Sequence, residues 1–107
     1  MALHVLQAAM AMVRQLRAPL AALARADGEL ASQLRRAASS VPLNIAEGSK
    51  RAGRDQAHHF RIAAGSAKEV TACLAVAEAW GYLEADALAE TRALLDREKA
   101  MLWKLTH

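Results

Sequence analysis

The sequence predicts an all-α protein folded as an up-and-down antiparallel four-helix bundle. Alanine supplies 27 of the 107 residues and leucine 15, and both residue types rank near the top of the helix-propensity scale. Aromatic residues make up only 4% of the chain, and they and the β-branched residues are the types that favour strands. Four segments with apolar residues at helical spacing are joined by short connections, which favours antiparallel neighbours. The length fits a single domain, residues 1–107.

The first helix is expected over residues 3–22. Pro19 lies near its end and either kinks the helix or stops it, because proline lacks an N–H and crowds the preceding turn. Asp27 then provides an N-cap for the second helix, since its side chain is able to accept a hydrogen bond from a free N–H of the first turn. The apolar stripe of the first helix recurs with a period of 3.6 and consists of Leu3, Leu6, Met10, Val13 and Leu16.

The second helix is expected to run from Asp27 to Gly48 and to be kinked at Pro42. Its apolar stripe keeps phase across the proline, which favours one kinked helix over two separate ones, and Gly48 is a natural terminator. Asn44 and Glu47 lie three residues apart on one side of this helix. We expect them to satisfy carbonyls released by Pro42 or to hold a neighbouring arginine; a catalytic carboxylate is the alternative. The stripe consists of Leu30, Leu34, Ala38, Val41 and Ile45.

The third and fourth helices are expected over residues 54–80 and 85–105. Gly65 weakens the third helix by about 1 kcal/mol relative to alanine, so we expect it to allow a close helix–helix contact. Gly81 ends that helix. Trp103 lies off the apolar face of the fourth helix, among charged residues, and is a candidate oligomer contact because tryptophan is enriched at interface hot spots. The inward residues are Phe60, Ala64, Ala67, Val70, Leu74 and Ala77 on the third helix and Leu88, Leu94, Leu95, Met101, Leu102 and Leu105 on the fourth.

The net charge of +3 is unevenly distributed. Residues 35–68 carry seven basic and two acidic side chains, a clustering that points to a surface for a polyanion. The alternative is a solvated basic surface in which Arg35 and Arg36 pair with Glu47 or Glu69 inside an assembly. Phe60 is the one aromatic residue in the cluster and is expected to point inward, which favours phosphate contacts over base stacking. The candidate nucleic-acid-binding residues are Arg35, Arg36, Lys50, Arg51, Arg54, Arg61 and Lys68.

Other sites are not indicated. His58 and His59 point about 100° apart on a helix, so they do not bind one metal ion together, and we expect no metal and no cofactor. Ser66 lacks the GxSxG turn of a hydrolase, and Cys73 lies in an apolar stretch as a small packing residue. We therefore expect a protein that is not an enzyme, has no signal peptide or membrane span, and is cytoplasmic.

Three blocks of the sequence carry a resemblance to a known family. They are QLRRAASSVPLNIAEG (33–48), FRIAAGSAKEV (60–70) and GYL (81–83). The chain resembles the bacterial four-helix bundle proteins known as 23S rRNA intervening-sequence proteins, which are similar to the accessory variability determinant of diversity-generating retroelements. The resemblance implies a homopentameric ring, no enzymatic activity, nucleic-acid binding and protein partners in the retroelement branch. The positions that match the family motifs are Arg35, Arg36, Pro42, Asn44, Glu47, Gly48, Arg51, Gly65, Ser66 and Glu69.

The sequence therefore supports two hypotheses about function. The first is an oligomeric nucleic-acid-binding protein whose basic edge contacts the phosphates of structured RNA or duplex DNA. The second is a ring-shaped adaptor that organises a protein partner without binding nucleic acid directly. The salt dependence of nucleic-acid binding distinguishes them.

Overall fold

The computed structural model describes residues 2–107, which form five α-helices and no strand. The all-α prediction is therefore confirmed. The predicted count of four helices is wrong, because the segment expected as one helix over 3–22 is divided into two. In chain order the helices are α1 (Ala2–Gln15), α2 (Arg17–Ala26), α3 (Gly28–Ser49), α4 (Gly53–Ala79) and α5 (Ala85–Thr106).

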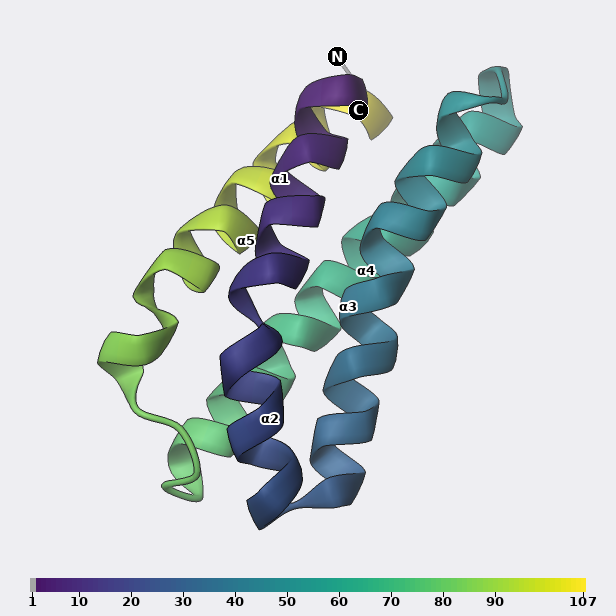
Figure 1. Ribbon diagram of the computed structural model, residues 1–107. Coiled ribbons are helices and arrows are strands. Elements are labelled where there is room, and N and C mark those ends of the chain that lie inside the picture. Colours follow the sequence, from purple (N-terminus) through teal and green to yellow (C-terminus); the bar gives the residue numbers. More distant parts are fainter. Residues whose placement is uncertain (1) are drawn as a thin grey trace.

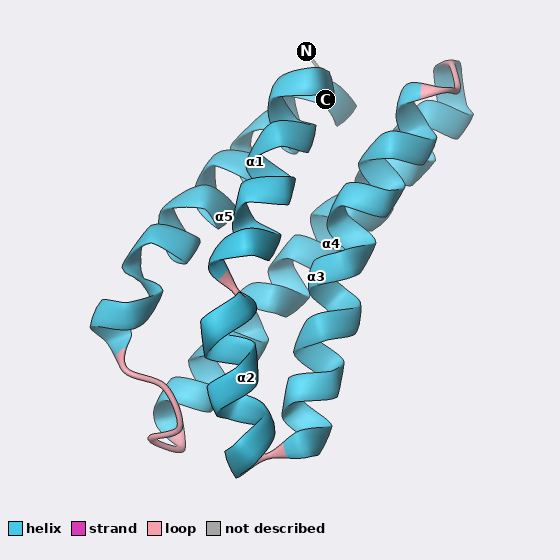
Figure 2. Cartoon of the chain, in the orientation of Figure 1, coloured by secondary structure: helices cyan, strands magenta, loops and turns pink. Residues whose placement is uncertain are grey.

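The helices lie along an elongated molecule with extents of 42 × 23 × 19 Å, in which α1 and α2 run in one direction, α3 runs back, and α4 and α5 reverse direction in turn (Figure 1). α1 and α2 follow one another along one side, α3 and α4 form a long antiparallel pair, and α5 returns beside α1. The connections between helices are short, and the longest joins α4 to α5 (Figure 2). Both ends of the chain therefore lie at the same end of the molecule as the turn between α3 and α4.

Pro19 explains the interruption between α1 and α2. Proline has no N–H to donate to the carbonyl of Gln15, four residues earlier, and its ring crowds that carbonyl. The helix is interrupted at Leu16. The N–H of Leu16 donates to two carbonyls, that of Val13 at 3.2 Å and that of Met12 at 3.0 Å. α2 begins at Arg17, so Pro19 falls in its first turn, where an N–H would have no partner within the helix.

Pro42 does not interrupt α3. The helix continues through it, as predicted, and the proline ring is buried in the core. The N-cap prediction is also confirmed, since Oδ1 of Asp27 accepts a hydrogen bond from the Leu30 N–H at 3.0 Å. A kink at Pro42 stays a prediction.

The predicted core faces are correct for α3, α4 and α5 and only partly correct for the first helix, where Leu16 is fully buried and Leu6 and Val13 pack against the core but Leu3 and Met10 do not. Leu3 is 62% exposed and Met10 is 43% exposed. Small alanines on the true inner face let α1 approach its neighbours closely, and this outweighs the larger side chains on the stripe that we expected to be buried. The buried residues of α1 are Val5, Ala8, Ala9 and Met12.

Two glycines have roles other than those predicted. Gly48 is buried inside α3 instead of terminating it, and a Cβ there would lie 2.7 Å from Cε1 of Phe60. Gly65 was expected at a close helix contact, but no atom lies within 4 Å of the place a Cβ would occupy. The close approach between α3 and α4 is therefore at Gly48, where the buried ring of Phe60 rests against the glycine backbone. Gly81 has a φ of +79° and ends α4, as predicted.

Candidate functional site

The seven predicted nucleic-acid-binding residues are all exposed, but they do not form one site. Arg51 is held between two carboxylates, with Nε 3.1 Å from Glu47 and Nη1 3.4 Å from Asp55. Arg36 donates to the Ser32 hydroxyl at 2.9 Å. Arg35 lies with Ser32 on a separate surface between α2 and α3. Lys50 is in the turn that follows α3, away from the helix faces.

The remaining three basic residues share one face of α4. Arg54, Arg61 and Lys68 are spaced seven residues apart, which is two helical turns less about 20°. None of the three forms an ion pair with another residue of the described range 2–107. Their positive charge is therefore available to a partner.

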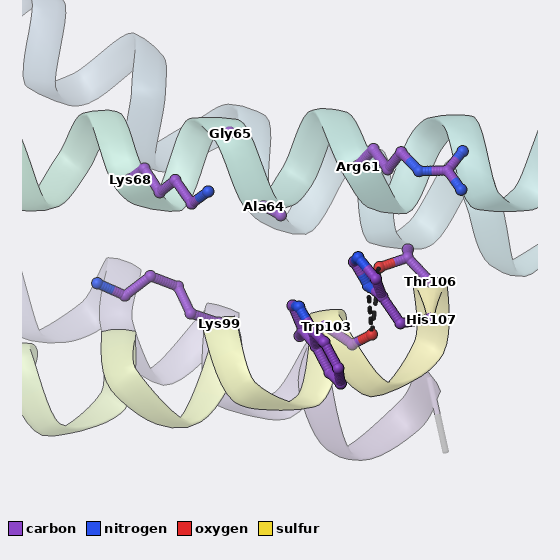
Figure 3. A pocket seen from close by; sticks show the side chains of 8 residues that line it. All are labelled: Arg61, Ala64, Gly65, Lys68, Lys99, Trp103, Thr106 and His107. Carbon is purple, nitrogen blue, oxygen red and sulfur yellow. Dashed lines mark hydrogen bonds between the residues drawn. The ribbon is translucent and has the colours of Figure 1, made fainter.

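Arg61 and Lys68 face α5 across a groove with a volume of about 330 Å³ (Figure 3). A third basic residue, Lys99, lies on the α5 side. Its ammonium group donates to the Thr71 hydroxyl on α4 at 3.1 Å and lies 3.7 Å from Asp96. The lining residues are Arg61, Ala64, Gly65 and Lys68 from α4 and Lys99, Trp103, Thr106 and His107 from α5 and the residue after it. The lining thus holds three cationic side chains and, within the described residues, no acidic side chain.

The exposed indole of Trp103 forms part of the α5 wall. It is 61% exposed, which confirms that it lies off the core face. Its ring is stacked on the imidazole of His107, with centroids 4.3 Å apart and planes within 7°. The backbone carbonyl of Trp103 lies 3.0 Å from Nδ1 of His107, so the stack is tied to the backbone as well.

Sequence reasoning placed Arg61 and Lys68 in the candidate surface but missed its aromatic component. Lys99, Trp103 and His107 recur every four residues, which places them on one face of a helix. Arg61 and Lys68, seven residues apart, likewise share one face of α4, the neighbouring helix. These two spacings together were the sequence pattern from which the groove could have been predicted.

A second polar cluster joins α3 to α4. The amide Nδ2 of Asn44 donates to the carbonyl and the hydroxyl of Ser40, both at 3.0 Å, and Oδ1 of Asn44 lies 3.2 Å from Nδ1 of His59. Ser66 donates to the Ser40 hydroxyl at 2.8 Å. Because His59 contacts the amide instead of either serine, the cluster has the connectivity of a structural network and not of a serine–histidine catalytic pair.

These contacts agree with the prediction for Glu47 but not with that for Asn44, which neither satisfies the carbonyl released by Pro42 nor holds an arginine. Asn44 bonds the carbonyl of Ser40, not that of Ala38, which is the carbonyl that Pro42 leaves without its usual donor. Glu47 accepts a hydrogen bond from a neighbouring arginine, Arg51, which is one of the two roles that we predicted for it. Glu69 accepts a hydrogen bond from Gln33 at 3.4 Å, so it too contributes to the packing of α3 on α4.

The inner face of α5 carries two polar residues that sequence reasoning did not identify. Thr91 and Glu98 are 1% and 0% exposed, and their side-chain oxygens have no hydrogen-bond partner within residues 2–107. Burial raises the pKa of Glu98 from 4.5 to about 7, and the nearby charge of Lys99 opposes this shift. Cys73 is buried, as predicted, and burial followed by the charge of Glu69 raises the pKa of its thiol.

The described part of the chain contains neither a metal-binding cluster nor a membrane-spanning helix. Among residues 2–107, no group of three or more histidine, cysteine, aspartate or glutamate side chains is arranged to hold a metal ion. None of the described helices has the length and apolar character needed to cross a membrane.

The fold and the groove define a small all-α protein with a basic, aromatic-containing surface between two antiparallel helices. The family model described as 23S rRNA-intervening sequence protein matches residues 1–104, and the chain belongs to this family. The resemblance seen in the sequence is confirmed to that extent. The further similarity to the accessory variability determinant of diversity-generating retroelements is not confirmed by the match. No curated protein matches the chain.

Proposed function

We propose that the protein binds nucleic acid without catalysing a reaction, and that the basic face of α4 contacts the phosphates. The observation that carries this proposal is the convergence of Arg61, Lys68 and Lys99 on one groove whose lining includes no acidic side chain of the described residues. Arginine and lysine contacts to phosphate supply most of the sequence-independent affinity for nucleic acid, because they release condensed counterions. The description of the family, which refers to an intervening sequence of 23S rRNA, is compatible with an RNA partner.

We also propose that the protein acts as a homo-oligomer, with the pentamer that the resemblance implies as the expected form. Large apolar side chains on α3 and α4 support this proposal, since Leu43 is 67% exposed and Ile62 is 38% exposed. Contacts between subunits would remove these apolar side chains from water, which is favourable. Light scattering measures the mass: a mass of one chain at micromolar concentration contradicts the assembly.

The test of nucleic-acid binding is fluorescence anisotropy with a structured RNA and a duplex DNA at about 50 and 200 mM salt. The test variant is the triple change Arg54→Ala, Arg61→Ala and Lys68→Ala. The matched control removes the same charge from α1 and α2, by changing Arg14, Arg17 and Arg25 to alanine.

Three phosphate contacts on a duplex correspond to a slope of about −2.7 in log affinity against log salt, which is roughly a 40-fold loss between the two conditions. We expect the wild type and the control to show at least this loss and the α4 variant to bind weakly at both salts. If the wild type binds neither polymer at the lower salt, the nucleic-acid proposal is wrong and the protein-adaptor hypothesis gains support.

A further inference from the structure

The groove between α4 and α5 contains an aromatic surface that phosphate binding does not require. Cations alone are enough to hold a phosphate backbone, yet Trp103 is exposed among three of them. Aromatic side chains combined with a basic groove are the arrangement by which proteins bind single-stranded nucleic acid, because every base has a π-face that stacks on an aromatic ring.

One face of the indole is open. The imidazole of His107 covers the other face. Figure 3 shows Trp103 between Lys99 and His107 along α5, with the backbone of Gly65 and the side chains of Arg61 and Lys68 across the groove. A planar group that enters the groove therefore meets the free face of Trp103 on the side of Lys99.

The opposite wall leaves room for such a group. Gly65 has no side chain, and no atom lies within 4 Å of the position that its Cβ would occupy. Ala64 beside it carries only a methyl group. The volume of about 330 Å³ is at the lower end of the range of about 300–1,000 Å³ that small-molecule sites span.

The cations flank this open space. Arg61 lies four residues before Gly65 and Lys68 three residues after it, so the two are about 10.5 Å apart along the axis of α4. The guanidinium of Arg61 is able to hold a phosphate with two parallel hydrogen bonds, and the ammonium of Lys68 acts as a point charge. Phosphates on both sides of one nucleotide thus have a partner when the base lies over Gly65.

We infer that the groove binds an unpaired nucleotide of a single-stranded or looped nucleic acid, with its base stacked on Trp103 and its phosphates held by Arg61 and Lys68. This inference rests on the proposed nucleic-acid binding and narrows its substrate class. A base inside a duplex has both faces covered by its neighbours and offers none to the indole, so a fully paired duplex meets only the cations.

The test compares two RNAs of equal length and charge: a hairpin with an unpaired loop, and a fully paired duplex. Trp103→Ala removes the stacking surface, and Gly65→Met fills the space across from it without changing the charge. Trp80→Ala is the matched control, because Trp80 is also exposed, at 68%, and lies at the other end of α4. Circular dichroism checks that each variant remains helical.

We expect Trp103→Ala to weaken binding of the loop RNA by about 5- to 150-fold, the range measured for one stacked base, and to leave duplex binding unchanged. Gly65→Met should give a loss in the same direction and Trp80→Ala none. In a Trp80→Phe background, loop RNA should quench the fluorescence of Trp103 and the duplex should not.

Two results would contradict the inference, and they differ in whether the proposed nucleic-acid binding is contradicted as well. If both RNAs bind with steep salt dependence and Trp103→Ala and Gly65→Met change neither affinity, the base-stacking site is wrong and phosphate binding stands. If neither RNA binds at about 50 mM salt, the site and the proposed function fail together.

Discussion

The buried carboxyl group of Glu98 makes the stability of the fold depend on pH. Its side chain is fully buried on the inner face of α5 and has no hydrogen-bond partner among the described residues. Burial disfavours the charged form and raises the pKa to about 7. The perturbation that isolates this group is Glu98→Gln, which has nearly the same shape and does not ionise.

The magnitude follows from the difference between the folded and unfolded pKa values. A shift from 4.5 to about 7 corresponds to about 3 kcal/mol, at 1.36 kcal/mol per unit. The folded protein holds the proton more tightly than the unfolded chain does, so the free energy of unfolding decreases as the pH rises between these two values. Below pH 4.5 the carboxyl is neutral in both states, and above pH 7 the loss is complete.

Urea unfolding at pH values between 4.5 and 8 measures this effect. We expect Glu98→Gln and the wild type to have similar free energies of unfolding near pH 4.5, and the variant to be more stable by about 3 kcal/mol at pH 8. Taking the difference at each pH removes the contributions of the histidines and other groups common to both proteins. Glu90→Gln on the exposed side of the same helix is the control and should differ by less than about 0.5 kcal/mol throughout. A constant difference across the whole range would refute the reasoning, because it would mean that Glu98 does not change its charge.

Four further substitutions test the contacts of α3 with α4 and the N-cap of α3, each by the change in urea midpoint. Gly48→Ala places a Cβ 2.7 Å from the ring of Phe60 and should destabilise the protein by about 1–3 kcal/mol. Gly65→Ala adds a Cβ in open space and should stabilise the protein by up to about 1 kcal/mol. If Gly65→Ala were the more destabilising of the two, the close contact between α3 and α4 would not be at Gly48. Asn44→Ala removes the amide that links α3 to α4 and should cost about 1–3 kcal/mol, whereas a neutral result would mean that water replaces its hydrogen bonds. Asp27→Ala removes the N-cap of α3 and should cost about 1 kcal/mol, with Asp27→Asn as the variant that retains most of the stability.

The sequence predicted the inner faces of α3, α4 and α5 well because their apolar residues recur at helical spacing mainly on one face. Phe60 and Leu74 on α4 are buried where the spacing placed them. In α1 the apolar residues are numerous on more than one face, so periodicity alone did not select the inner one. Leu3 and Met10 were assigned to the inner stripe by their helical spacing, but the face that is buried contains Ala8 and Ala9. Local pattern fixes which residues share a face and not which face meets a neighbour.

The same limit applies to the glycines and to the candidate site. Whether Gly48 or Gly65 lies at a close contact depends on the register between α3 and α4, which one sequence does not encode in any local spacing. The groove likewise depends on the register between α4 and α5, which places Trp103 and Gly65 in the lining of one groove. The basic residues were predicted as a group because charge clustering is visible in the chain. The sequence did not show which of these basic residues pair with carboxylates. The structure shows that Arg51 pairs with Glu47 and Asp55.

The charge around Trp103 bears on whether its exposed ring serves a subunit contact or a nucleic-acid contact. An indole covered by a neighbouring subunit has no free face for a base, so the two roles exclude each other at any one copy. A subunit contact centred on Trp103 would also bury Arg61, Lys68 and Lys99, and charged residues are depleted from the centres of protein interfaces because removing them from water is costly. Bound phosphates would compensate the same three charges. We therefore propose that Trp103 belongs to the nucleic-acid surface, and we expect the contacts between subunits at apolar positions with fewer cations nearby, such as Leu43 on α3.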